Sequence, residues 1–267
     1  MAHPKNAMEI FSLLDKSNCR KCNETTCLAF AAAVFQGRKP ISECPKLSSE
    51  IVARYSSSTE KPQPAEQDGD QAAAKLQGQI AAVDLLTAAE RVGGRYANGK
   101  LTIKVLGKDF SVDGKGRMSS DIHIHPWIAI PVLSYILQSK GTPVSGNWVP
   151  LRELPNGRTW RGLFEQRGEK DLKKVADGYP ELFEDMIHIF NGRQVEKHYA
   201  ADISLVMHPL PKVPMLICYW HPEDGLQSSL NLFFDSTAED HLNIEALYAL
   251  GTGMVRMLEK ISHRHGV

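Results

Sequence analysis

The sequence lacks an excess of charge of either sign. Its 267 residues include 31 Lys and Arg against 31 Asp and Glu. Because no surplus of cations is present to displace counterions from phosphates, a general nucleic-acid-binding protein is not expected. Hydrophobic residues make up 42% of the chain and charged residues 23%. That balance is typical of a globular protein and excludes disorder of the whole chain.

Long apolar runs are also missing. The opening residues, MAHPKNAMEIFSLLDK, contain acidic side chains and no continuous apolar core like that of a secretory signal. The longest stretch without Asp, Glu, Lys or Arg, residues 122–139, contains two histidines and two prolines. Such a stretch favours a strand followed by a buried helix over a membrane span. We expect a cytoplasmic protein with no membrane contact.

Several catalytic fingerprints are absent from the sequence. It contains no G-x-G-x-x-G after a strand, no G-x-x-x-x-G-K-[ST], no G-x-S-x-G and no H-E-x-x-H. Whether the protein is an enzyme is therefore left open. An electron-transfer or cofactor-binding protein is favoured over a stand-alone enzyme.

Cysteine is scarce, but its distribution is uneven. Four of the five cysteines lie in one short segment with the spacing C-x2-C-x4-C-x16-C, namely Cys19, Cys22, Cys27 and Cys44. In a reducing cytosol, clustered cysteines favour metal binding over disulfides. Zinc ribbons usually carry two separated C-x2-C pairs, and only one is present, so an iron–sulfur cluster is favoured while structural zinc stays open. Cys218 is expected to be a small buried hydrophobe rather than a fifth ligand.

The residues around the cysteines predict a short helix. Thr25 or Thr26 can cap a helix that begins near Cys27, and Gly37 suits its end. This helix would carry the chain back so that Cys44 can approach the loop. Backbone N–H groups at its start would point toward the sulfurs.

The chain is predicted to contain two units joined by a linker. Residues 1–55 form a small metal-stapled unit, residues 56–75 a flexible linker rich in Ser, Pro and Gln, and residues 76–267 a larger unit. In the larger unit, one helical stretch carries Leu76, Ile80, Val83 and Leu86 and stops at Gly93-Gly94. The short turns between strands favour an α+β fold with a mainly antiparallel sheet and flanking helices.

Further elements of the larger unit follow from periodicity and caps. Helices are expected over residues 126–139, 159–191 with a break at 178–180, and 244–262 with Asn243 as N-cap; extended segments are expected over 101–105, 109–112, 148–154, 202–207, 215–220 and 229–235. Residues 208–214 contain three prolines. Because proline lacks the ladder donor, this segment is predicted to be a loop and no part of a central strand.

Candidate chemistry in the larger unit rests on histidines. Asp121, His123 and His125 alternate, so in a strand all three would lie on one face and could hold a metal or ligate a cofactor cobalt or iron. The alternative is a polar strand end that leads into the helix at Pro126, with His125 near the cap. His221 lies in a turn after an apolar strand, where either a functional or a solvated role fits.

Residues 18–45 resemble the iron–sulfur domain at the N-terminus of the large subunit of the corrinoid iron–sulfur protein of anaerobic acetyl-CoA metabolism. That domain reads approximately N-C-G-x-C-G-x-x-T-C-x-x-F-A, followed by a glycine and C-P. The resemblance implies that the four clustered cysteines hold a [4Fe-4S] cluster. Arg20 and Asn23 stand where that family commonly has glycine, and Asn tolerates left-handed backbone angles better than Arg.

The larger unit is similar to a domain family of anaerobic bacteria and archaea without an assigned function. The similar stretches are residues 146–148, 152–155, 210–214 and 232–235. The two resemblances together imply an electron-transfer protein of anaerobic metabolism that reduces or binds a corrinoid cofactor or corrinoid protein, with a methyltransferase as a further candidate partner and His123 or His125 as axial ligand. An accessory factor that docks a client enzyme, and an enzyme that uses the cluster for reductive chemistry, remain alternatives.

Overall fold

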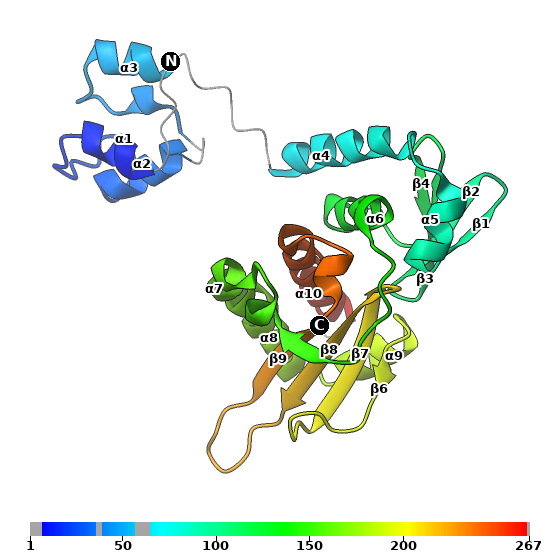
Figure 1. Ribbon diagram of the computed structural model, residues 1–267. Helices are drawn as coiled ribbons and strands as arrows, with labels where there is room; N and C mark the ends of the chain where they lie inside the picture. Colours follow the sequence, from blue (N-terminus) through cyan, green and yellow to red (C-terminus); the bar gives the residue numbers. More distant parts are fainter. Residues whose placement is uncertain (1–6, 36–38, 57–64, 266–267) are drawn as a thin grey trace. The chain divides into compact units, whose positions relative to one another are not determined.

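The computed structural model describes residues 7–35, 39–56 and 65–265. The chain divides into two compact units, residues 1–68 and 69–267, and the division falls inside the segment predicted to be a linker. Figure 1 shows the elements of each unit. Among the described residues, no helix combines the length and the apolar composition that crossing a bilayer requires.

The first unit consists of short helices around a small apolar core. They are α1 (Ala7–Leu13), α2 (Cys27–Phe35), a 3-10 turn (Ile41–Glu43) and α3 (Ser49–Ser56). Thr26 Oγ1 accepts a hydrogen bond from Ala29 N at 3.0 Å, so the predicted cap of α2 is confirmed. Gly37, the expected end of this helix, lies outside the described residues.

Two helices replace the single helical stretch predicted at the start of the second unit. They are α4 (Ala65–Ile80) and α5 (Leu85–Val92). Asp84 separates them because its carboxylate caps α5, accepting hydrogen bonds from Leu86 N at 3.0 Å and from the Thr87 hydroxyl at 2.5 Å. Residues 65–75, predicted to be linker, are helical instead, since Ala, Gln and Glu are good helix formers. The predicted stop is confirmed, because Gly93 is left-handed with φ 67°.

The first sheet is a short antiparallel meander. Within the described residues its order is β1-β2-β3-β4, with β1 (Arg95–Ala97), β2 (Lys100–Val105), β3 (Lys108–Asp113) and β4 (Met118–Ser120). The predicted hairpin is confirmed: β2 and β3 pair with Ile103 opposite Phe110, and Leu106 and Gly107 turn the chain with positive φ.

The second sheet forms the base of the core. Within the described residues its order is β5-β9-β8-β7-β6, and all neighbouring pairs are antiparallel. Its strands are β5 (Trp148–Pro150), β6 (Arg193–Gln194), β7 (Ile203–Leu210), β8 (Val213–Trp220) and β9 (Ser229–Asp235). Two antiparallel sheets with separate helices make an α+β fold, as the sequence predicted.

The prediction that residues 208–214 form a loop was wrong except at Pro211 and Lys212, which make the turn between β7 and β8. Strand β7 continues through Pro209, and Pro214 lies within β8 in the middle of the sheet. The prolines are tolerated because the pairing is irregular there: the register shifts between Met207 and Leu210. Proline at such a bulge does not remove a regular ladder bond.

Helices cover one face of the five-stranded sheet. They are α6 (Pro126–Gln138), α7 (Arg161–Phe164), a π-helical turn (Glu165–Glu169), α8 (Lys170–Gly178), α9 (Leu182–His188) and α10 (Ile244–His265). Figure 1 shows α8 and α10 on the same face of this sheet. Strand residues such as Ile217 and Phe234 share one core with helix residues such as Leu172 and Leu247. Asn243 Oδ1 accepts from Ala246 N at 2.8 Å, which confirms the predicted cap of α10.

A buried carboxylate joins the loop before β5 to the end of β9. The Asp235 side chain is fully buried and accepts hydrogen bonds from Ser145 N at 3.1 Å, Gly146 N at 2.7 Å and Thr237 N at 3.0 Å. The hydroxyls of Ser145 and Thr237 donate to it as well, at 3.0 and 2.6 Å. Asp235 is therefore the organising side chain of the loop that leads into β5.

Candidate functional site

Three of the four clustered cysteines lie in the core of the first unit. Cys22, Cys27 and Cys44 are 8%, 7% and 8% exposed and pack with Phe30 and Ile41. Cys19 is half-buried, and all four side chains are free thiols. The chain thus places four reduced sulfurs in one small unit.

Polar contacts hold the cysteine loop in shape. Asn18 Oδ1 accepts a hydrogen bond from Cys27 N at 2.7 Å, which ties the start of the loop to the start of α2. Lys39 Nζ donates to Cys22 O at 2.7 Å. The same ammonium lies 3.4 Å from a Glu24 oxygen and 3.6 Å from a Glu43 oxygen. Lys39 therefore joins the loop that carries Cys22 to the turn that carries Cys44.

The two departures from the resembled glycine pattern both have left-handed backbones. Arg20 has φ 60° and Asn23 has φ 58°, and Asn23 N donates to Arg20 O at 3.0 Å to close a turn. Glycine adopts this conformation without a Cβ penalty, and Asn tolerates it. Arg20 is the strained position, at a cost of about 1 kcal/mol. The loop conformation explains why glycine fits both positions.

Replacing Arg20 by glycine is expected to stabilise the cysteine loop. Removing the Cβ at φ 60° relieves the strain, so a metal-loaded Arg20→Gly protein should lose its metal to a chelator about three- to five-fold more slowly than wild type. Lys21→Gly is the matched control, because Lys21 is not among the residues with positive φ. Equal or faster loss from Arg20→Gly would contradict the strain argument.

The surroundings of Cys19 favour its thiolate form. The backbone N–H of Lys21 donates to the Cys19 sulfur and lowers the pKa of that thiol, with burial opposing it. Lys46 Nζ lies 2.5 Å from an Asp15 oxygen and donates to Ser17 Oγ at 2.9 Å. It thereby holds a cation beside the loop. Thiolate is the form that binds soft metals.

The donor set fits an iron–sulfur cluster by residue type, burial and charge. Such clusters take four thiolates as ligands, and at Cys19 a backbone N–H and the Lys46 cation lie near the sulfur. In residues 7–35, 39–56 and 65–265, no group of three or more His, Cys, Asp or Glu side chains is arranged to hold a metal ion. The assignment of Cys19, Cys22, Cys27 and Cys44 as ligands therefore stays a prediction.

The strand predicted to carry Asp121, His123 and His125 on one face does not exist. Strand β4 ends at Ser120, and the three residues lie in the connection to α6. His125 is the N-cap of α6, and its Nδ1 accepts a hydrogen bond from Trp127 N at 3.4 Å. This is the capping role that the sequence left as the alternative. Asp121 and His123 are exposed.

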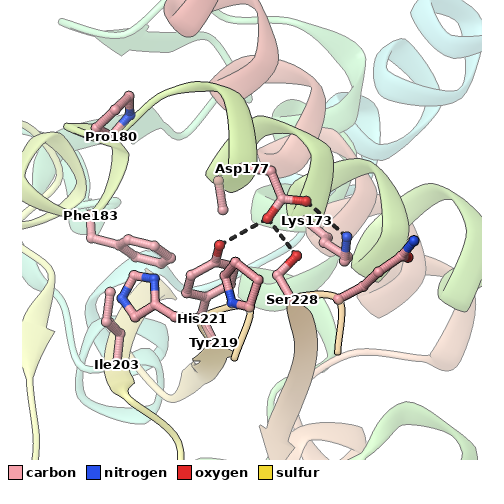
Figure 2. Close-up of a pocket in the computed structure, with 11 residues that line it drawn as sticks. Lys173, Asp177, Pro180, Phe183, Ile203, Tyr219, His221 and Ser228 are labelled. Carbon is pink, nitrogen blue, oxygen red and sulfur yellow. Dashed lines mark hydrogen bonds and ion pairs between the residues drawn. The ribbon is translucent and has the colours of Figure 1, made fainter. Parts of the chain in front are cut away.

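The second unit contains a cleft that the sequence did not predict. Its volume is about 660 Å³, and it lies between α8, α9 and the hairpin that joins β8 to β9 (Figure 2). At its back, Asp177 accepts hydrogen bonds from Tyr219 Oη at 2.8 Å, Ser228 Oγ at 2.7 Å and Lys173 Nζ at 2.8 Å. Of these residues and their neighbours in the cleft, the sequence singled out His221 alone, because the others come together only through the fold.

The surroundings of Asp177 and Tyr219 determine the protonation state of both side chains. Burial alone would raise the pKa of Asp177, but the hydrogen bonds from Lys173, Ser228 and Tyr219 outweigh it and lower that pKa. Burial and the hydrogen bond to Asp177 raise the pKa of Tyr219. At neutral pH, Asp177 is therefore an anion that accepts, and Tyr219 is a phenol that donates.

The comparisons with known proteins identify both units. Residues 14–46 match the family model "Putative Fe-S cluster", so this segment of the first unit is similar to iron–sulfur domains. Residues 84–257, more than half of the chain, match the "Domain of unknown function (DUF3786)". The chain belongs to the DUF3786 family.

Two curated relatives match a short part of the chain. The gamma subunit of the acetyl-CoA decarbonylase/synthase complex of Methanothermobacter thermautotrophicus is 45% identical over 42 residues, and that of Methanocaldococcus jannaschii is 42% identical over 43 residues. Each match covers 16% of this chain and 9% of the relative. The chain therefore spans about one tenth of the length of these relatives. No solved structure matches the chain significantly.

Proposed function

We propose that the protein is a one-electron carrier of anaerobic metabolism, with a [4Fe-4S] cluster on Cys19, Cys22, Cys27 and Cys44. The observation that carries the proposal is the burial of three of these thiols in one core, within residues that match an iron–sulfur family model. When bound, such a cluster accepts and releases single electrons. Lys39, Asn18 and the start of α2 would hold the thiolates in place.

The electron acceptor we propose is a corrinoid centre, on a partner protein or bound to this chain. The support is the similarity to gamma subunits of the acetyl-CoA decarbonylase/synthase complex, which also points to a partner within a multi-protein assembly. If the corrinoid binds here, His123 is the better axial-ligand candidate. Its imidazole is exposed, whereas His125 Nδ1 is engaged in capping α6.

Anaerobic mixing with cobalamin tests the proposed acceptor. Protein reduced with dithionite and freed of excess reductant should convert cob(III)alamin to cob(II)alamin with one electron per cobalt, seen by absorbance. The control is Cys27→Ser protein treated identically, which should transfer no electrons. No spectral change and no binding at about 50 µM cobalamin would end the corrinoid proposal. A His123→Ala protein that still binds cobalamin would remove His123 as the ligand.

A further inference from the structure

We propose that the cleft between α8, α9 and the β8–β9 hairpin binds a small organic anion that carries a flat apolar ring. All residues that line this cleft belong to the second unit. Its volume of about 660 Å³ falls within the range of small-molecule sites, which is roughly 300–1,000 Å³. The cleft is thus large enough for a one- or two-ring ligand.

One end of the cleft is apolar and aromatic. Figure 2 shows Pro180, Phe183 and Ile203 on the side away from Lys173 and Ser228. The Phe183 and Tyr219 ring centroids are 5.4 Å apart, and the Tyr219 and His221 rings meet edge to face with centroids 5.0 Å apart. Rings in such tilted arrangements offer faces and edges on which a planar ligand packs favourably.

The polar end of the cleft contains hydrogen-bond donors that have no partner among the described residues. The Asp177 carboxylate already receives three hydrogen bonds. Lys173 has one hydrogen-bond partner among the described residues, Asp177, which leaves two of its ammonium hydrogens free. No described residue bonds the His221 ring nitrogens or the Gln227 amide, and both residues line the cleft. The free hydrogens of the Lys173 ammonium call for acceptors on the ligand, and an anionic group pairs best with that ammonium.

The site is held in shape without a ligand. Tyr219 and Ser228, one on each side of the hairpin, are both tied to Asp177 on α8. His221 N donates to an Asp202 oxygen at 2.8 Å, which fixes the start of the hairpin against the residue before β7. Binding groups supported in this way lose little freedom when a ligand binds.

Two probes with the same ring and opposite charge test the proposed ligand class. They are 1-naphthoate and 1-naphthylmethylamine, titrated into the full-length protein with calorimetry and with NMR of the His221 imidazole. We expect saturable naphthoate binding with a shift of the His221 signals, and at least ten-fold weaker binding of the amine. The absence of naphthoate binding at up to about 5 mM, or binding of the amine that is equal or tighter, would overturn the proposal.

Variants locate the binding within the cleft. Lys173→Met keeps the aliphatic stem, removes the ammonium, and should weaken naphthoate binding about ten-fold or more. Lys174→Met is the matched control, because Lys174 pairs with Asp171 and does not line the cleft. His221→Ala should also weaken binding, and thermal melting checks that each variant is folded. Naphthoate affinity unchanged in both folded cleft variants would place the binding elsewhere and overturn the proposal.

Discussion

Replacing Cys27 by serine is expected to remove the iron from the protein. Cys27 is 7% exposed, begins α2 and donates its backbone N–H to Asn18 Oδ1 at 2.7 Å. Serine preserves that backbone contact and nearly the same volume, but it replaces a soft thiolate by a hydroxyl that stays protonated at neutral pH. Iron in anaerobically purified protein should therefore fall from about four atoms per chain to less than about one.

The matched control for this prediction is Cys218→Ser. Cys218 is also a free, buried thiol, but it lies in β8 and packs with Val206 and Leu216 on the sheet face opposite the main core. Its sulfur lies 4.0 Å from Ser204 Oγ, so a hydroxyl there can find a partner. Cys218→Ser should keep its full iron content. Full iron in Cys27→Ser, or equal loss in both variants, would contradict the ligand assignment.

The second large effect is expected from Asp235→Ala, which should destabilise the second unit by about 4 kcal/mol. The variant deletes a buried carboxylate and leaves the backbone N–H groups of Ser145, Gly146 and Thr237, whose hydrogen bonds to it are partly buried, without their acceptor. For a unit of this size, the loss corresponds to a fall in Tm of roughly 10 °C. Asp171→Ala, which breaks a surface pair with Lys174, should change stability by less than about 1 kcal/mol.

The Asp235 carboxylate also makes the stability of the second unit depend on pH. Burial alone would raise the pKa of Asp235, but hydrogen bonds from Thr237 and Ser145 outweigh it and hold that pKa below its usual value. The unfolded chain therefore takes up a proton before the folded chain does. The contribution of Asp235 is complete above about pH 5 and is lost as the pH falls through the pKa of the folded state. Denaturant unfolding at pH 7 and pH 2.5 should show a smaller difference for Asp235→Asn than for wild type.

Local chemistry made several elements predictable from sequence. Thr26 and Asn243 each cap the helix that follows, and Gly93 ends α5 with a left-handed backbone. These features act within a few residues, so the sequence alone suffices. Where two local tendencies competed, prediction failed. Asp84 starts a new helix inside an apolar periodic stretch, and Pro214 lies in a central strand because the neighbouring strand is bulged.

The cysteine segment and the cleft also differ in how far the sequence predicts them. The spacing of the four cysteines is readable because all of them lie within one short segment. The cleft cannot be predicted in this way. Its residues Asp177, Tyr219 and Ser228 lie in α8, in β8 and directly before β9, and they meet only after the sheet has formed. The alternation of His123 and His125 predicted a strand that does not form, whereas the predicted place of His125 at the helix cap is confirmed. A period of two over so few residues does not distinguish a strand from a loop.

Iron, acid-labile sulfide and zinc measured in the full-length protein purified without oxygen test the central claim most directly. With EPR of the dithionite-reduced sample, we expect about four iron and about four sulfide per chain and a signal from a one-electron-reduced cluster that is absent in Cys27→Ser. About one zinc per chain, with no EPR-active iron, would contradict the account and assign the four cysteines to a structural zinc site.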